Sequence, residues 1–321
     1  MQAIVQDRYG PIDVLQLRDI DKPAIGEDEV LVRVRAASLH VGDLFGVRGS
    51  PFPVRMMSGL LRPRVGVPGF DIAGQVESVG GKVTRFRPGD EVFGVGIGAC
   101  AEYARAAEDK LLPKPVDLTW EQAAAIPTSG LAALNGLRDA GKLQPGQRVL
   151  INGASGGVGT FAIQITKALG AEVTAVCSTR NVDLVRSLGA DHVIDYTRED
   201  FTTGEARYDL IFDNVENRSL AECRRVLAPS GTLVLNSGTG AGGLRMLARL
   251  VWPLVLSSFT SHTLRRYLSN PIQADLVALT QLVEDGKVRP VIGRTYPLSE
   301  TPAALRHIES GHARGKVVVT V

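Results

Sequence analysis

A glycine-rich turn at residues 152–159 is the strongest chemical signal in this sequence. It reads NGASGGVG and lies between an apolar run that ends at Asn152 and an amphipathic stretch that favours a helix from about Gly157. Gly156 lets a backbone approach a pyrophosphate, Gly159 lets the helix pack closely on the strand, and the helix start offers free N–H groups. Although Ala154 replaces the first glycine of the G-x-G-x-x-G fingerprint, the context predicts a dinucleotide-binding turn rather than a tight turn without a ligand. Its residues are Ala154, Ser155, Gly156, Gly157, Val158 and Gly159.

The residues that follow the next expected strand, 172–177, indicate which dinucleotide binds. Sites that prefer NAD place an Asp or Glu at this strand end, where it accepts hydrogen bonds from the ribose hydroxyls. This chain has no carboxylate there: Ser178 and Thr179 can donate hydrogen bonds, and the Arg180 guanidinium can pair with a 2′-phosphate. We therefore expect NADPH rather than NADH; the alternative is that Arg180 only solvates a helix start.

Two later strand ends offer further contacts. Asn214 and Val215 follow the strand expected at 208–213, and Ser237 and Gly238 follow the one at 231–236. Parallel strands deliver such residues to a ligand-binding edge, so we expect Asn214 and Val215 to line the nicotinamide and Gly238 to admit a ligand close to the backbone. Simple strand-to-helix turns are the alternative at both places.

Length and composition set the frame for these residues. The chain has 321 residues, 44% of them hydrophobic and 22% charged, with a net charge of +2, which predicts about two globular domains and excludes disorder, a coiled coil and a basic nucleic-acid surface. The three cysteines lie far apart, without zinc-site or disulfide spacing, so a reducing cytoplasm is expected. No secretory signal is visible, and the apolar run Leu250–Leu256 is too short to cross a bilayer.

The order of the expected elements divides the chain. The first 115 residues are rich in glycine, proline and short β-branched runs, which predicts a β-rich domain. From Thr119, whose hydroxyl is placed to cap a helix, strands alternate with amphipathic helices, which predicts a parallel sheet. The tail turns β again at 289–296 and 316–321, and these strands are expected to rejoin the first domain.

Several segments together resemble the zinc-independent quinone oxidoreductase-like branch of the medium-chain dehydrogenase/reductase superfamily. They are AASLHVGD at 36–43, VPGFDIAGQVESVG at 67–80, RFRPGDEVFG at 85–94, AAAIPTSGLAALNGL at 123–137, NGASGGVG at 152–159 and LGADHVIDY at 188–196. The resemblance implies an α/β protein with a GroES-like β-rich catalytic domain, residues 1–118 and 266–321, and a Rossmann domain with a doubly wound parallel sheet, residues 119–265. It also implies a nicotinamide in the intervening cleft, a small hydrophobic quinone or enone as substrate, and a homodimer.

The resemblance also bears on metals. Zinc-dependent relatives hold their catalytic ion at positions that correspond to His40, Phe70 and Thr128, of which only His40 could be a strong ligand. Their four-cysteine structural zinc lobe is reduced here to Cys100, so no metal is expected. Without a Lewis acid, the substrate should be one that accepts hydride readily, such as a quinone or an enone.

Side chains must then stabilise the charge that develops on the substrate. His40 and Asp43 are the candidate catalytic residues, because a histidine can donate to an oxyanion or deliver a proton near neutral pH. The alternative is that His40 fixes its loop by hydrogen bonds while Asp43 caps a turn. By family correspondence, Thr128 and Asn214 are further candidate donors to the substrate oxygen and contact the cofactor. Tyr196 approaches the phosphate of the adenosine ribose, with a plain surface tyrosine as the alternative.

Two segments are candidates for other contacts. Residues 50–67 are apolar and proline-rich and carry three arginines; Phe52, Met56, Met57, Leu60 and Leu61 suit the lip of a hydrophobic substrate pocket or an interface. Residues 255–262 correspond to an edge strand that pairs with its twin across a two-fold axis. The competing functions are an NADP-dependent enoyl-thioester or carbonyl/alcohol oxidoreductase and, outside enzymes, an NADPH-binding regulatory or structural protein.

Overall fold

The computed structural model describes residues 1–236, 261–267 and 272–321 of the chain. By its internal contacts the chain forms two compact units. We call Met1–Ser129, Pro271–Thr280 and Pro290–Val321 the terminal unit, because it contains both chain ends, and Gly130–Asn270 with Gln281–Arg289 the central unit. Among the described residues, no helix is both long enough and apolar enough to span a bilayer.

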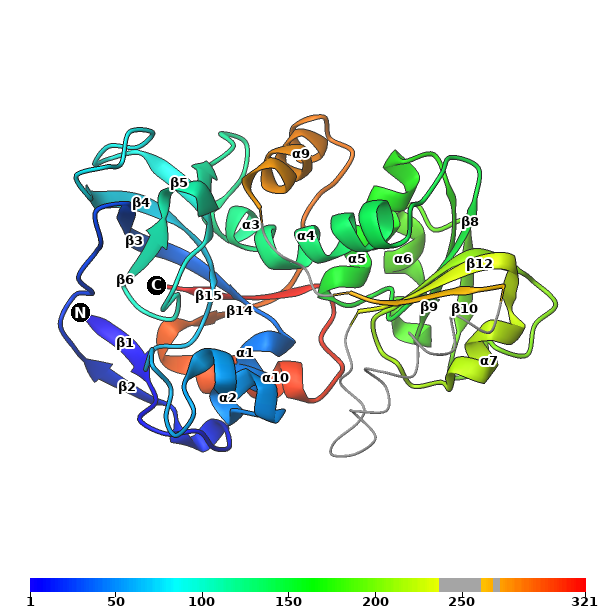
Figure 1. Cartoon of the computed structure of the whole chain (residues 1–321), viewed down its shortest axis with the longest axis horizontal. Helices are drawn as coiled ribbons and strands as arrows, with labels where there is room; N and C mark the ends of the chain where they lie inside the picture. Colours follow the sequence, from blue (N-terminus) through cyan, green and yellow to red (C-terminus); the bar gives the residue numbers. More distant parts are fainter. Residues whose placement is uncertain (237–260, 268–271) are drawn as a thin grey trace. The chain divides into compact units, whose positions relative to one another are not determined.

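A seven-stranded sheet forms the frame of the terminal unit (Figure 1). Its strands run in the order β14, β15, β3, β4, β5, β7, and β6 pairs with β3 off this path. The tail strand β15 pairs antiparallel with β3, and β14 pairs parallel with β15, so the prediction that the tail rejoins the first domain is confirmed. The strands are β3 (Glu29–Leu39), β4 (Asp71–Val79), β5 (Glu91–Val95), β6 (Tyr103–Ala107), β7 (Leu111–Pro113), β14 (Ile292–Pro297) and β15 (Lys316–Thr320), beside a hairpin of β1 (Gln2–Val5) and β2 (Gln16–Asp19).

Short helices with defined caps complete the terminal unit. Thr119 and Gln122 form the expected capping box at the start of α3, and α3 packs on β3, β4 and β15. This packing places α3 in the terminal unit, whereas the sequence boundary was expected at 118/119; the contact boundary falls inside α4, after Ser129. The helices are α1 (Val41–Arg48), α2 (Phe52–Ser58), α3 (Trp120–Ala124), α4 (Pro127–Asn135), α9 (Gln273–Glu284) and α10 (Thr301–Glu309), of which α4 and α9 continue into the central unit.

The central unit is built on a six-stranded parallel sheet in the order β10, β9, β8, β11, β12, β13. The order reverses direction at β8, which is the doubly wound arrangement that the alternating strands and helices predict. Its elements are β8 (Arg148–Asn152), α5 (Gly157–Ala168), β9 (Glu172–Cys177), α6 (Val182–Ser187), β10 (His192–Asp195), β11 (Tyr208–Asp213), α7 (Leu220–Arg225), β12 (Leu227–Leu235) and β13 (Thr263–Arg266). An edge strand was expected at 255–262. Residues 255–260 of it lie outside the described residues, residues 261 and 262 are not in a strand, and β13 covers Thr263–Arg266.

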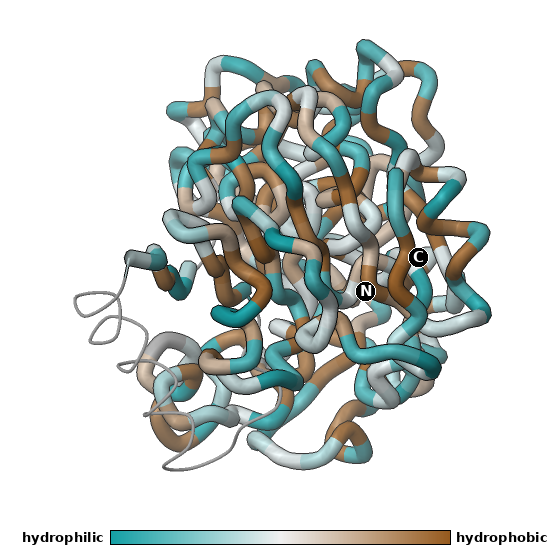
Figure 2. Tube along the Cα trace, turned by 90° about the vertical axis from the view of Figure 1, so that its right-hand side faces the viewer, coloured by the Kyte–Doolittle hydropathy of each residue, from teal (hydrophilic) through white to brown (hydrophobic). Residues whose placement is uncertain are grey.

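Each unit has its own apolar core, and the hydropathy changes repeatedly along the chain as strands and helices bury one face (Figure 2). In β3, Val30, Val32 and Val34 are buried on one face. On the other face Leu31 is buried and Arg33 is exposed, so this second face is only partly covered.

An ionic network lies inside the core of the terminal unit. Lys316, the first residue of β15, is buried; its Nζ donates to Ser129 Oγ at 2.8 Å and lies 3.5 Å from Asp71 Oδ2. Asp71, at the start of β4, accepts at Oδ1 from the amide of Thr128 at 3.1 Å and from its hydroxyl at 2.5 Å. Burial raises the pKa of the nearby Asp43 carboxyl, and the positive charge of Lys316 is among the effects that oppose this rise. Burial also lowers the pKa of Lys316, against the pull of Asp71 and Asp43.

Replacing Lys316 with methionine should therefore destabilise the protein by about 3–5 kcal/mol, because it leaves two buried carboxylates without a cation. Loss of the ammonium raises the pKa of Asp43 further above its unfolded value. The folded variant then binds more protons than its unfolded chain, so its stability falls as pH rises through the folded pKa. Urea unfolding should show a larger loss near about pH 8 than near about pH 5.

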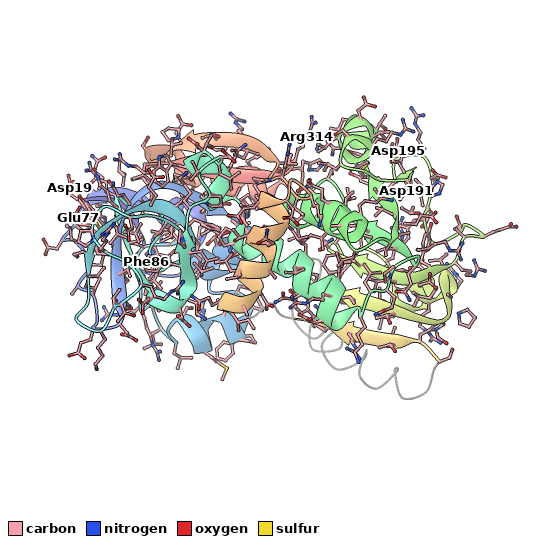
Figure 3. The ribbon with its side chains drawn as sticks, turned by 90° about the horizontal axis from the view of Figure 1, so that it is seen from above. Asp19, Glu77, Phe86, Asp191, Asp195 and Arg314 are labelled. Atoms are coloured by element: carbon pink, nitrogen blue, oxygen red, sulfur yellow. The ribbon has the colours of Figure 1, made fainter. Side chains whose placement is uncertain are left out.

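A matched surface variant is the control for this prediction. Lys22 forms an exposed ion pair with Glu77, labelled in Figure 3, and Lys22→Met should cost less than about 1 kcal/mol. Adding Asp71→Asn to Lys316→Met should recover part of the stability. Equal losses for the two lysine variants, at both pH values, would contradict the structural role of the network.

Candidate functional site

The glycine-rich turn has the geometry that the sequence predicts. β8 ends at Asn152, Gly153 adopts φ 75°, and Gly156 is the N-cap of α5. A Cβ at Gly159 would lie 2.2 Å from Gly153 O, so only glycine allows α5 to pack this closely against the turn. Ala154 is buried and its amide donates to Val176 O at 3.1 Å, which ties the turn to the neighbouring strand β9.

The N-terminus of α5 fits a phosphate group. Among the residues that the structure describes, no side chain caps the helix, so the first amides, from Gly157 to Gly159, can donate to an anion at the positive end of the helix dipole. Among the described residues, a Cβ at Gly156 would meet only Gly153 O, at 3.4 Å, which leaves room above the backbone. The residues present therefore fit a dinucleotide pyrophosphate.

A buried asparagine that the sequence analysis did not single out connects two predicted contact groups. Asn181 Nδ2 donates to Ser155 Oγ at 2.9 Å and lies 3.3 Å from Ser178 Oγ. It therefore joins the glycine-rich turn to the end of β9. An asparagine at the start of a helix gives no signal of this long-range role in sequence.

The end of β9 differs from expectation in one respect. A carboxylate does lie there: Asp195, from the end of the neighbouring strand β10, accepts a hydrogen bond from Thr179 Oγ1 at 2.6 Å (Figure 3). This hydrogen bond and those from Thr197 hold the pKa of Asp195 below its usual value, and Arg198 lies 3.5 Å away. The expectation of no acidic group at this edge was wrong because parallel pairing brings Asp195 opposite Cys177. Arg180 and Tyr196, the next predicted residues, are both exposed beside it.

A network of amides and one carboxylate shapes the end of β11. Asp213 is buried, and its Oδ1 accepts from the amides of Val215 and Glu216 and from Asn152 Nδ2. Burial raises the pKa of Asp213. Asn214 Nδ2 donates to Asn152 O at 3.1 Å, and Val215 packs against Gly153. The structure thus brings Asn214 and Val215 to the glycine-rich turn; Ser237 and Gly238 lie outside the described residues.

His40 and Asp43 form a capping box at the start of α1. His40 Nδ1 accepts from the amide of Gly42 at 2.9 Å, and Asp43 Oδ2 accepts from the amide of His40 at 2.7 Å. The loop-fixing role that the sequence left open is therefore present. Because Nδ1 is an acceptor, the proton of the neutral ring lies on Nε2. Nε2 is buried and has no hydrogen-bond partner among the described residues.

The three positions that correspond to zinc ligands do not provide a zinc site. The ring of Phe70 has no donor atom and stacks near His40, with 6.2 Å between ring centroids. Thr128 directs its hydroxyl proton to Asp71, and His40 Nδ1 already accepts a backbone hydrogen bond. A tetrahedral zinc ion needs three or four free N, O or S donors, and this set does not fit it.

The cysteines are buried in the two cores. Burial, reinforced by the charge of Asp43, raises the pKa of the Cys100 thiol, and burial with the nearby Asp195 raises that of Cys177 to about 11. Burial likewise raises the pKa of Cys223 to about 12. Because a thiolate is the reactive form, none of these three groups is suited to nucleophilic chemistry near neutral pH.

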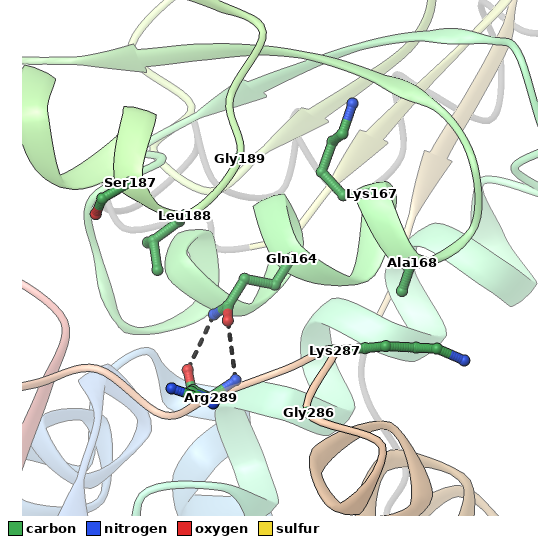
Figure 4. A pocket seen from close by; sticks show the side chains of 9 residues that line it. All are labelled: Gln164, Lys167, Ala168, Ser187, Leu188, Gly189, Gly286, Lys287 and Arg289. Atoms are coloured by element: carbon green, nitrogen blue, oxygen red, sulfur yellow. Dashed lines mark hydrogen bonds between the residues drawn. The ribbon is translucent and has the colours of Figure 1, made fainter.

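A shallow pocket of about 640 Å³ lies at the other end of α5 (Figure 4). Gln164 and the backbone of Arg289 exchange two hydrogen bonds of 2.9 Å at its base. Both lysines that line it form ion pairs, Lys167 with Asp191 and Lys287 with Asp285. The pocket contains no residue predicted for the site and adds nothing to it.

Comparison with known proteins agrees with this architecture. Residues 26–116 match the family model described as the alcohol dehydrogenase GroES-like domain, and residues 188–319 match the one described as zinc-binding dehydrogenase. The mouse protein called NAD(P)H oxidoreductase RTN4IP1, mitochondrial, is 34% identical over 379 residues, covering 100% of this chain and 89% of the relative.

Two further relatives support the same assignment. The Arabidopsis thaliana protein called NADPH-dependent alkenal/one oxidoreductase, chloroplastic, is 32% identical, with 99% of this chain and 79% of the relative covered. The solved structure of the quinone oxidoreductase from Coxiella burnetii superposes with a TM-score of 0.88 at 31% identity, covering 100% and 99% of the two chains. The chain therefore belongs to the quinone oxidoreductase-like branch of the medium-chain dehydrogenase/reductase superfamily, with its GroES-like and Rossmann domains.

Proposed function

We propose that this protein transfers hydride from NADPH to a quinone or an α,β-unsaturated carbonyl compound without a catalytic zinc ion. Membership of the family and the names of the NAD(P)H and NADPH-dependent oxidoreductase relatives support an oxidoreductase that uses a nicotinamide cofactor. The observation that carries the finer proposal is the donor set at His40, Phe70 and Thr128, which does not fit a metal. The names of the alkenal/one and quinone oxidoreductase relatives support the substrate class.

The central unit holds the cofactor in this proposal. The free amides of α5 bind the pyrophosphate, Ser178 and Arg180 bind the 2′-phosphate, and Tyr196 lies beside the adenosine ribose. Asn214 and Val215, which lie at the glycine-rich turn, line the nicotinamide. The bound nicotinamide supplies the hydride from its C4 atom.

His40 acts as a hydrogen-bond donor rather than as a general acid. The imidazolium form carries protons on both nitrogens, but the amide of Gly42 already donates to Nδ1. The neutral ring keeps one proton, on the buried Nε2, which can donate to a substrate oxygen as negative charge develops there. Asp43 is a positioning residue, because it binds the amide of His40 and is itself buried.

We further infer a homodimer in a reducing cytoplasm. β13 is the last strand in the order of the central sheet and follows the segment expected to pair with its twin. All three cysteines are unpaired, which suits a reducing compartment.

The decisive experiment follows the absorbance of NADPH, with NADH in parallel, while chelator-treated protein is offered a panel of quinones and enones. We expect turnover with NADPH and a hydroquinone or a saturated carbonyl as the product. Turnover that returns only after zinc is added would overturn the metal-free reaction. Tight NADPH binding without turnover of any acceptor would favour a thioester substrate or a sensor role instead.

Replacing His40 should separate its two roles. In His40→Ser the hydroxyl can still accept from a backbone amide at the helix cap, but the Nε2 donor is lost, so kcat should fall about a hundredfold with little change in KM for NADPH. His40→Asn keeps both an acceptor and a donor and should retain more activity. Steady-state kinetics and thermal melting check this; full turnover of His40→Ser would refute the donor role.

Cofactor preference should respond in opposite directions to two neighbouring substitutions. Arg180→Gln removes a charged fork for the 2′-phosphate and should raise KM for NADPH about tenfold or more while leaving KM for NADH nearly unchanged. Asp195→Asn removes a nearby negative charge and should lower KM for NADPH. Parallel kinetics with both cofactors measure the ratio, and equal changes for NADPH and NADH would rule out a 2′-phosphate site at Arg180.

A further inference from the structure

Residues 44–70 carry an unusual combination of charge and apolar surface. The stretch contains four arginines and no aspartate or glutamate, although the whole chain has a net charge of only +2. It also holds six of the eleven large hydrophobic residues that are exposed in the described part of the chain. These are Phe52, Met56, Leu60, Leu61, Val65 and Phe70.

The apolar side chains project from a fixed base. Phe52 and Met56 lie one turn apart on α2, so they share a helix face. The loop after α2 is closed by a hydrogen bond of 2.7 Å from the amide of Arg64 to Ser58 O. Tyr9 Oη donates to Gly59 O at 2.6 Å and anchors this loop to the N-terminal segment. Leu60 and Leu61 stand at the tip of the closed loop, where Leu61 is 88% exposed.

The arginines divide into structural and unpaired ones. Arg48 forms an ion pair with Glu309, and Arg55 stacks on the ring of Tyr9 and donates to Gly49 O. Arg62 and Arg64, which follow Leu60 and Leu61 in the sequence, are exposed and form no ion pair with the described residues. Asp7, in the N-terminal segment, forms an ion pair with Arg18, with 2.7 Å between Oδ2 and the guanidinium nitrogen. The loop tip therefore exposes the apolar side chains of Leu60 and Leu61 beside two positive charges that form no ion pair with the described residues.

We propose that this surface, the α2 face with the loop tip at residues 60–65, docks the protein on an anionic lipid bilayer. Leucine, phenylalanine and methionine side chains enter the boundary between headgroups and acyl chains, and arginines beside them bind lipid phosphates. In an anionic bilayer the acyl chains lie directly beneath the negatively charged headgroups. This matches a loop in which the exposed Leu61 is followed at once by Arg62 and Arg64. A folded protein partner would need a dedicated apolar pocket lined by carboxylates.

Flotation of the full-length protein with vesicles tests the proposal. Vesicles of phosphatidylcholine alone are compared with vesicles that also contain phosphatidylglycerol, at physiological and at high ionic strength. We expect binding to the anionic vesicles, weaker binding to the neutral ones, and release at high salt. Arg62→Gln with Arg64→Gln should weaken binding about 25-fold, since each basic residue near the surface contributes about fivefold. Leu60→Ser with Leu61→Ser should weaken it at least about tenfold.

Matched variants elsewhere in the terminal unit serve as controls. Val116 is exposed and Arg87 lies on another loop, so Val116→Ser with Arg87→Gln should bind vesicles like the unaltered protein. Thermal melting checks that each variant is folded. Equal binding to neutral and anionic vesicles, or unchanged binding of the loop-tip variants, would overturn the proposal. A third outcome would also overturn it: the unaltered protein binds no vesicles, and the loop-tip variants no longer self-associate in sedimentation. The patch would then be an interface between copies of the chain.

Discussion

The buried ammonium of Lys316 is the constraint on which the terminal unit depends. It arrives with β15, the last strand of the chain, and meets Asp71 from the start of β4 and Ser129 from α4. A charge in an apolar core is tolerated only when partners surround it, so the tail strand, the sheet and α4 must all be in place together. The same Asp71 binds Thr128, and its chain neighbour Phe70 stacks near His40.

This network also fixes the geometry of the region near His40. A salt-bridged carboxylate, a hydroxyl and a capping box hold the positions that correspond to the zinc ligands of zinc-dependent relatives. Three buried atoms of this arrangement have no hydrogen-bond partner among the described residues: Nε2 of His40, Oδ1 of Asp43 and Oδ2 of Asp71. Buried polar groups are almost always paired, and Nε2 is the atom that carries the proton of the neutral His40 ring, so in the proposed reaction it donates to the substrate oxygen.

In the central unit, neutral side chains and one carboxylate hold the loops at the ends of the strands in place. Asp213 gathers two backbone amides and Asn152, and Asn181 joins the glycine-rich turn to the end of β9. Each of these side chains holds a loop at the carboxyl end of a parallel strand, where doubly wound sheets bind their ligands. The loops can therefore present backbone amides to a cofactor without first having to be ordered.

Local sequence determined the turns and the periodic elements, because these depend on neighbouring residues. The glycines at 153–159 dictate a strand-to-helix turn, the Thr119–Gln122 pair dictates a helix start, and alternating apolar runs dictate buried strands. Only the tertiary structure decided the long-range partners: Asp195 beside Thr179, Asn181 beside Ser155, and Lys316 beside Asp71. The two residues of each pair lie far apart in the sequence and follow no helix or strand period, because strand order and register bring them together. The role of His40 also needed the structure, because only the direction of the Gly42 amide shows which ring nitrogen is already occupied.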